Sequence, residues 1–298
     1  MQKVESFVVD YKQKTDGPVF DYGEATDYPN DLYRFKTLAA GVDSFANVTP
    51  AQIAQFHDQG YLVVHNAFTP DEVQAALDGL LYLVSGQNPD YKGVMLEKKA
   101  QGVDVQSLPA EQKQDYVRKF MDFVGHEARL KALAEHPKLI QLLTQLLGEP
   151  PQLFQDMAML KPPRIGREKP WHQDHAYFDL PLTTTVIGVW IALDEATTEN
   201  GCMVIYPNSH RAGPVVHFSR RDWQICDTYD RYQGAMAVPL KPGGALFFHS
   251  LIHHGTPANA SVQRRRAVQF HYKPQSVAKI AQAERLAVFG SEGKDVTC

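Results

Sequence analysis

Short β-rich segments separated by turns make up the second half of this chain, and they restrict its fold more than any other sequence feature. The segments cover residues 153–160, 184–193, 203–206, 244–248 and 267–272. Turn-forming residues separate them, as in Lys161-Pro162-Pro163, Glu199-Asn200-Gly201 and Pro242-Gly243-Gly244. Short strands at this spacing are typical of a β sandwich or barrel.

The first half has mainly helical patterns. Thr49-Pro50-Ala51-Gln52 and Thr69-Pro70-Asp71-Glu72 are capping boxes with proline at the first helical position, and each predicts the start of a helix. A strand at residues 61–65 separates these two helices, and further helical patterns cover residues 113–124 and 137–147. Helices that precede the strands in sequence predict an α+β fold with the helices packed on one sheet.

The composition is that of an ordinary globular protein. Of the 298 residues, 44% are hydrophobic and 21% are charged. The formal net charge of -4 gives no support for a nucleic-acid or membrane partner. No apolar run approaches 18 residues, the N-terminus lacks a signal-peptide pattern, and the three cysteines suggest a reducing compartment. We therefore expect a cytoplasmic protein, either a monomer or a homo-oligomer.

A candidate metal site lies in Trp171-His172-Gln173-Asp174-His175. If this stretch is an extended strand, the side chains of His172 and Asp174 point to the same face. An imidazole nitrogen and a carboxylate oxygen so placed can bind one divalent metal. They would supply two of the three ligands in the 2-His-1-carboxylate triad of non-heme Fe(II) proteins. The third ligand must then be a histidine from elsewhere in the chain.

Several histidines are candidates for the third ligand. His210, His217 and His271 stand in turn or strand positions, and the richest cluster lies at residues 247–256. In that cluster His253 competes with His254, which precedes a glycine that lets backbone approach a ligand closely. Downstream, the guanidinium of Arg265 suits bidentate capture of a carboxylate beside a metal. Its alternative role is a buried structural ion pair.

The residues alone leave three functions open. The first is an oxygenase with an Fe(II) site. The second is a Zn(II) hydrolase that uses the same His/Asp/His set with a metal-bound water as nucleophile. The third is a catalytically silent barrel that binds a ligand. An anion site tied to the metal favours the oxygenase, because a hydrolase has no need for one.

The order and spacing of several motifs resemble the phytanoyl-CoA dioxygenase family, from about residue 50 to residue 273. The matching motifs are His172-x-Asp174, Trp190-x-x-Leu193-Asp194, Asn200-Gly201-Cys202, Pro207-Asn208-Ser209-His210 and His254-Gly255-Thr256, followed by Arg265. The family consists of Fe(II)- and 2-oxoglutarate-dependent oxygenases built on a double-stranded β-helix, a jelly-roll or cupin-like barrel.

The resemblance implies a single oxygenase domain over residues 1–298. Within it we expect an N-terminal wrap (1–47), a mainly helical layer (48–150), a jelly-roll core with the metal site (151–273) and a C-terminal tail (274–298).

The resemblance also implies roles for particular residues. His172, Asp174 and His254 would be the catalytic metal ligands, and Arg265 with the Thr256 hydroxyl would hold the distal carboxylate of 2-oxoglutarate. It further places Gln173, Met157, Lys161 and Trp190 near the cofactor. The expected reaction uses O2 to oxidise an unactivated C–H bond of a small organic substrate, with release of succinate and CO2. The family acts on acyl thioesters, amino acids and other natural products, so the substrate stays open.

Overall fold

The structure is a computed structural model that describes residues 19–20, 27–227 and 234–290. In these residues the strands form a large sheet, a smaller sheet and a hairpin. The large sheet has the order β1 (Val19–Phe20), β4 (Val94–Leu96), β5 (Val117–Met121), β6 (Pro151–Lys161), β15 (Arg265–Pro274), β8 (Ile187–Ala192), β13 (Ala245–His249), β3 (Tyr61–Val64). The smaller sheet has the order β2 (Thr37–Leu38), β12 (Met236–Val238), β9 (Met203–Tyr206), β14 (His253–Thr256), β7 (Lys169–His172). The hairpin pairs β10 (Phe218–Ser219) with β11 (Trp223–Gln224).

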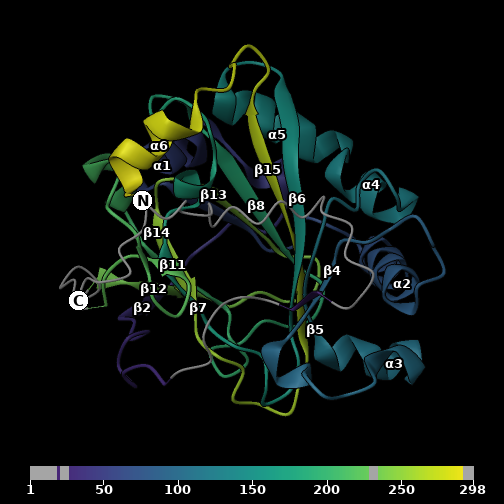
Figure 1. The fold of residues 1–298 in the computed structure, drawn as a ribbon. Coiled ribbons are helices and arrows are strands. Elements are labelled where there is room, and N and C mark those ends of the chain that lie inside the picture. Colours follow the sequence, from purple (N-terminus) through teal and green to yellow (C-terminus); the bar gives the residue numbers. More distant parts are fainter. Residues whose placement is uncertain (1–18, 21–26, 228–233, 291–298) are drawn as a thin grey trace.

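Helices cover one face of the large sheet, and the smaller sheet covers the other (Figure 1). The α-helices are α1 (Pro50–Gln59), α2 (Pro70–Ser85), α3 (Ala110–Lys113), α4 (Ala128–Ala134), α5 (Pro137–Leu147) and α6 (Gln282–Phe289). The 3-10 turns are η1 (Phe45–Asn47), η2 (Lys98–Ala100), η3 (Val105–Ser107), η4 (Gln114–Tyr116), η5 (Asp174–Tyr177) and η6 (Ser209–Ala212). Each described helix is too short or too polar to cross a bilayer.

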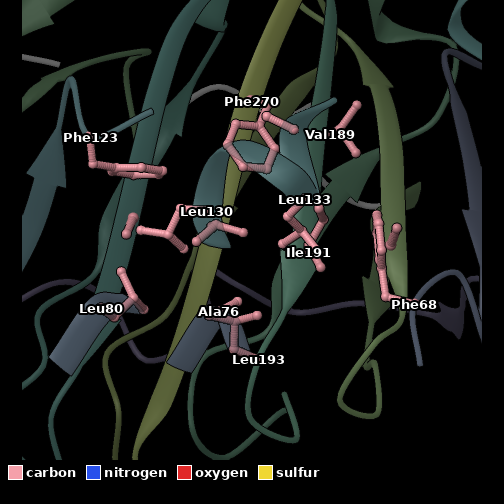
Figure 2. Packing of buried hydrophobic residues seen from close by; sticks show 14 of the residues in the cluster. Phe68, Ala76, Leu80, Phe123, Leu130, Leu133, Val189, Ile191, Leu193 and Phe270 are labelled. Carbon is pink, nitrogen blue, oxygen red and sulfur yellow. The ribbon is translucent and has the colours of Figure 1, made fainter. Parts of the chain in front are cut away.

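The two faces of the large sheet follow from the alternation of side chains along its strands. On β8 and β15, Val189, Ile191 and Phe270 face the helices and pack with side chains such as Leu130 from α4 (Figure 2). The intervening residues, including Trp190, face the smaller sheet across a second hydrophobic core. The space between the two sheets is the interior of the barrel, and the side chains that project into it come mainly from the second half of the chain.

The start of the helical half is fixed by its capping residues. The Thr49 and Thr69 hydroxyls accept backbone N–H groups in the first turns of α1 and α2, and both predicted capping boxes are present. Gly60 ends α1 in a left-handed conformation with φ of 81°. A side chain there would also collide with the His210 ring, because a Cβ would lie 2.5 Å from its Nδ1 atom.

Most of the predicted elements are confirmed, and one is wrong. Of the helix predicted over residues 113–124, only the first residues, through Tyr116, are helical, and the central part is strand β5, which pairs with both β4 and β6. In β5 Phe120 is fully buried under the helices, whereas Lys119 lies opposite Met159 on the other face. Sheet pairing has overridden a weak helical pattern. The first half consequently contributes β1, β4 and β5 to the large sheet as well as the predicted strand β3.

Candidate metal centre

His172 and Asp174 lie where β7 ends and the η5 turn begins. Gln173 between them is still extended, with φ of -115° and ψ of 127°, so both flanking side chains point to the same side. The two-residue spacing therefore places both side chains on one face, as predicted, although strand β7 ends at His172.

His254 reaches the same point from β14. It lies directly opposite His172 in the antiparallel pairing of β14 with β7, and the two ring centroids are 4.1 Å apart. Asp174 Oδ1 is 3.2 Å from His172 Nε2 and 3.5 Å from His254 Nε2. One ligand atom from each of these three residues lies within 4.8 Å of the others, and all three side chains are buried. The neighbouring His253 projects to the opposite face of the strand.

Backbone carbonyls orient both histidines. His172 Nδ1 is 2.7 Å from the carbonyl oxygen of Pro170, and His254 Nδ1 is 3.1 Å from that of Ile252. A carbonyl only accepts hydrogen bonds, so these contacts assign the ring proton to Nδ1. The Nε2 lone pair of each ring is then directed at the shared point, as in metal-binding histidines generally.

Two side chains from β15 hold the other oxygen of Asp174. Gln269 Nε2 donates a hydrogen bond of 3.0 Å to Oδ2, and His271 Nε2 lies 2.8 Å from the same atom. Oδ1 is left facing the two histidines. The carboxylate is thus fixed in an orientation that offers one oxygen to a metal.

The electrostatics of the site match this donor set. Burial, reinforced by the nearby His254, lowers the pKa of His172 to about 4, so its imidazole is neutral at pH 7. Burial alone would raise the pKa of Asp174, but His254, His271 and His172 outweigh it and leave this pKa well below the usual value. A buried carboxylate beside two imidazoles is the nitrogen and oxygen donor set that suits non-heme Fe(II).

Arg265 projects into the same barrel interior from the start of β15. Its guanidinium is almost fully buried and lies 5.3 Å from the centroid of the Trp190 ring. Burial and the nearby Arg118 lower its pKa to about 9, so it is still charged at pH 7. In the described part of the chain, its one side-chain hydrogen bond goes to the carbonyl of Met159, at 3.4 Å, and it forms no ion pair. The alternative role as a structural ion pair is therefore not observed.

Several buried polar atoms between Arg265 and Asp174 have no hydrogen-bond partner among the described residues. They are Trp190 Nε1, Arg265 Nε, Gln269 Oε1 and His271 Nδ1. Trp190 and Gln269 lie directly opposite each other in the pairing of β8 with β15. A buried polar atom without a partner costs about 1–3 kcal/mol. Atoms of this kind beside a charged guanidinium fit a polar, anionic ligand such as 2-oxoglutarate.

The structure corrects two of the predicted cofactor contacts. The Gln173 side chain faces away from the triad, where its amide donates to the carbonyls of Gly213 and Leu251 and accepts from the Val215 N–H. These hydrogen bonds stabilise the turn, and they direct the Gln173 side chain away from the expected position of the cofactor. Lys161 lies directly opposite Arg265 in the pairing of β6 with β15, so its side chain starts on the same face, but its ammonium donates to the carbonyl oxygens of Arg167, Thr256 and Pro257. These three carbonyls use all its N–H donors.

Two other predicted residues, Met157 and Thr256, lie on strands β6 and β14. Met157 is directly opposite Gln269 in the pairing of β6 with β15, so its side chain shares the interior face. Thr256 is buried two residues after His254 on β14.

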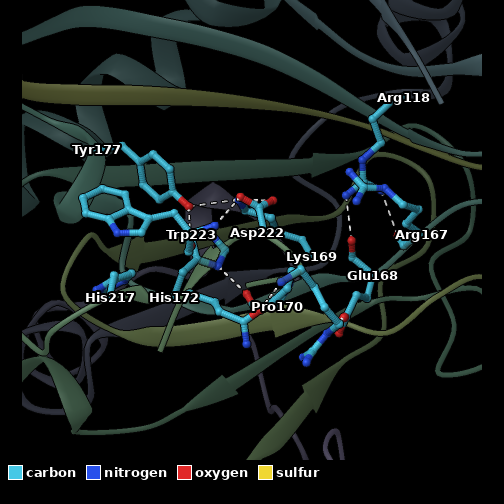
Figure 3. A network of polar contacts seen from close by, with 12 residues as sticks. Arg118, Arg167, Glu168, Lys169, Pro170, His172, Tyr177, His217, Asp222 and Trp223 are labelled. Atoms are coloured by element: carbon cyan, nitrogen blue, oxygen red, sulfur yellow. Dashed lines mark hydrogen bonds and ion pairs between the residues drawn. The ribbon is translucent and has the colours of Figure 1, made fainter. Parts of the chain in front are cut away.

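A polar cluster borders the metal centre on the side of His172 (Figure 3). Lys169 Nζ lies 2.8 Å from Asp222 Oδ2 and 3.1 Å from the Tyr177 hydroxyl, which donates to the carbonyl of Trp223. The Tyr177 ring packs edge-on to His172, with centroids 5.9 Å apart. The hairpin segment that carries Asp222 and Trp223 is therefore hydrogen-bonded to the rim of the site.

Sequence reasoning missed the function of Gln269 and treated His271 only as a candidate third ligand. A signal for both was available in the spacing. Arg265, Gln269 and His271 are separated by even numbers of residues within one strand, so they share a face. Because Arg265 is expected to point inward, the same alternation predicts that the side chains of Gln269 and His271 also lie in the interior.

Comparisons with known proteins agree with the geometry. The model of the phytanoyl-CoA dioxygenase (PhyH) family matches residues 56–267. The phytanoyl-CoA dioxygenase domain-containing protein 1 of Danio rerio is 27% identical over 272 residues, covering 75% of this chain and 89% of that protein. The phytanoyl-CoA dioxygenase of Arabidopsis thaliana is 28% identical over 260 residues, covering 76% of this chain and 88% of that protein.

Solved structures show the same fold. EctD from S. alaskensis in its apoform has a TM-score of 0.63 at 20% identity and covers 88% of this chain and 85% of its own. SnoK, a non-heme alpha ketoglutarate dependent carbocyclase from nogalamycin biosynthesis, has a TM-score of 0.62 at 20% identity, with coverage of 87% and 98%. The predicted α+β double-stranded β-helix is confirmed.

Proposed function

Because the chain belongs to the phytanoyl-CoA dioxygenase family of Fe(II)- and 2-oxoglutarate-dependent oxygenases, we propose that it hydroxylates an unactivated C–H bond of a small organic molecule. The observation that supports this most directly is the convergence of His172, Asp174 and His254 in a barrel interior that also holds a buried Arg265, which has no acidic partner among the described residues. A hydrolytic zinc site would not need such an anion-binding group.

Each residue of the site has a separate role. His172 and His254 would bind the metal through Nε2, and Asp174 would bind it through Oδ1, while Gln269 and His271 keep the carboxylate in place. Arg265 would hold the distal carboxylate of 2-oxoglutarate, next to the Trp190 ring. Fe(II) and 2-oxoglutarate, when bound, supply the oxidation, in which one atom of O2 enters succinate, CO2 is released and the other atom enters the product.

The barrel itself contributes water exclusion and rigidity. All three ligand side chains are buried, and two of them belong to paired strands. Residues on regular elements hold a ligand geometry more tightly than residues on loops. The polar groups of the site are thus fixed before any ligand binds.

Formation of succinate from 2-oxoglutarate tests the proposal without knowledge of the substrate. The full chain with Fe(II), 2-oxoglutarate and O2 should form succinate slowly, and Asp174→Ala should abolish this formation while circular dichroism stays unchanged. Asp58→Ala, which removes a carboxylate that is 60% exposed and remote from the triad, is the matched control and should retain full activity. Equal succinate formation by Asp174→Ala and the wild type would refute the assignment. Tight zinc binding without any succinate would favour the hydrolase.

A further inference from the structure

A cavity of about 710 Å³ opens beside the outer face of the smaller sheet, and Cys202 from the core between the two sheets forms part of its lining. Tyr33 and Val204 line it, and both belong to the small hydrophobic cluster on the outer face of the smaller sheet. None of the three metal ligands lines it, nor does Arg265. Lys161 lies between this cavity and the barrel interior, because its ammonium bonds to the carbonyls of Arg167 and Pro257, which line this cavity. The volume is in the range of small-molecule sites.

The basic side chains that line this cavity outnumber the acidic ones. Its lining contains four basic residues, Arg34, Lys99, Arg164 and Arg167, and two acidic ones, Asp27 and Glu168. Arg167 lies 3.5 Å from Glu97, and Glu168 is bonded to Arg221 and Tyr33, so these two side chains are already compensated. Three cations and one carboxylate remain, which is a surplus of two positive charges.

The three remaining cations have no acidic partner among the described residues. Arg34, Lys99 and Arg164 are all exposed, and none of them forms an ion pair or a side-chain hydrogen bond there. They come from three separate segments of the chain and meet at one cavity. Like charges gathered around a hollow repel one another unless an anion binds between them.

Aromatic side chains form another part of the lining. Phe35 is 41% exposed, which is high for a large apolar residue. The Tyr28 ring is fixed, because its hydroxyl accepts the Ala258 N–H at 2.9 Å and its edge packs on Tyr33 with centroids 5.3 Å apart. A flat apolar group bound in the cavity would cover Phe35.

We propose that this cavity is a second ligand site, which binds a small organic phosphate with a planar ring. A phosphate monoester carries about -1.5 to -2 charges at pH 7, which matches the surplus of two positive charges. Guanidinium groups such as those of Arg34 and Arg164 bind phosphate oxygens through paired N–H donors, and Lys99 adds a third charge. The ring of the ligand would lie against Phe35. The site is independent of the metal centre.

Calorimetric titration of the full chain tests this site, with adenosine 5′-monophosphate and inorganic phosphate as probes. Both should bind, and adenosine 5′-monophosphate should bind more tightly. Arg164→Ala and Lys99→Ala should each weaken both probes about tenfold, as expected for loss of one charge-assisted contact. Phe35→Ala should weaken the nucleotide and leave inorganic phosphate unchanged. Arg211→Ala, which removes an arginine that is 63% exposed and lies outside the cavity lining, is the matched control and should bind like the wild type.

Other outcomes would overturn the proposal. They are the absence of binding by both probes at millimolar concentration, an equal loss in Arg211→Ala, and succinate binding as tightly as phosphate. Competition by 2-oxoglutarate, or loss of binding in Asp174→Ala, would place the probe at the metal centre instead. Succinate formation should be the same in Arg164→Ala as in the wild type. This readout keeps the test separate from that of the catalytic function.

Discussion

The two oxygens of Asp174 have different surroundings, and this difference sets the orientation of the whole site. Oδ1 faces the histidines, while Oδ2 is held by Gln269 and His271 from β15. The pattern His-x-Asp followed by a distant histidine could be read from the sequence because strand periodicity fixes it. The supporting contacts could not be read, since they depend on which strands become neighbours in the sheet.

Loss of the β15 contacts should weaken metal binding without unfolding the protein. We expect Gln269→Leu to bind Fe(II) about 10–100-fold more weakly, because a rotated carboxylate presents Oδ1 less often to the metal. Anaerobic Fe(II) titration measures this, and Gln152→Leu, an exposed glutamine on β6, is the control. Equal Fe(II) affinity in Gln269→Leu and the wild type would show that this hydrogen bond does not orient the ligand.

Arg265 is buried without an acidic partner in the described part of the chain, and a buried unpaired charge costs stability, so Arg265→Leu should keep or raise the melting temperature of the ligand-free protein. The same variant should need at least about tenfold more 2-oxoglutarate for half-maximal succinate formation. Differential scanning calorimetry and the dose dependence together check this. A variant that unfolds would instead support a structural role for the charge.

At the scale of elements, α6 supports the turn that carries Asp174, although α6 lies outside residues 56–267. Arg285 donates to the carbonyl of Ala176 in η5 and pairs with Asp179 at 2.8 Å. His217 links the same two elements, because its N–H donates to the Phe289 carbonyl and its Nε2 accepts the Gln173 N–H. In Figure 1 this helix, coloured yellow, lies at the upper left, on the opposite side of the view from α2 and α4.

Removal of the α6 contact should loosen the metal site. Arg285→Ala deletes a side chain that is 2% exposed and leaves Asp179 without its partner, so we expect Fe(II) affinity to fall several-fold and the melting temperature to drop by a few degrees. Lys279→Ala, an exposed change just before the helix, serves as the control. Unchanged Fe(II) affinity together with a lower melting temperature would limit Arg285 to a role in stability.

The elements also show where sequence reasoning fails. Capping boxes at Thr49 and Thr69 gave the starts of α1 and α2, since the signal is local. Strand β5 was mistaken for a helix because its pattern is weak and its pairing with β4 and β6 joins residues far apart in sequence. The same limit applies to the side-chain contacts of Gln173 and Lys161, because their hydrogen-bond partners come largely from other segments of the chain.

For the whole molecule, buried neutral histidines make stability depend on pH. Burial lowers the pKa of His217 to about 3 and that of His249 to about 3, against about 6.5 in the unfolded chain. Between these values the unfolded state binds more protons, so this stability is complete above pH 6.5 and is lost as the pH falls toward 3. Protonation of His217 would also break its bond with the Gln173 N–H.

Urea unfolding of the metal-free protein measures this dependence. The free energy of unfolding should be lower at pH 5 than at pH 7.5, with His217 alone accounting for about 2 kcal/mol. In His217→Gln that share should disappear, so the difference between the two pH values should shrink by the same amount. A wild-type protein equally stable at both pH values would contradict the neutral, buried state of these rings.

The central claim is that three side chains from two distant segments bind one ferrous ion, with a guanidinium placed to hold 2-oxoglutarate. Anaerobic visible absorption spectroscopy of the full chain tests it most directly. Addition of Fe(II) and 2-oxoglutarate together should produce a weak charge-transfer band that neither gives alone, and the band should be lost in His254→Ala. No band in the wild-type protein, or an undiminished band in His254→Ala, would contradict the claim.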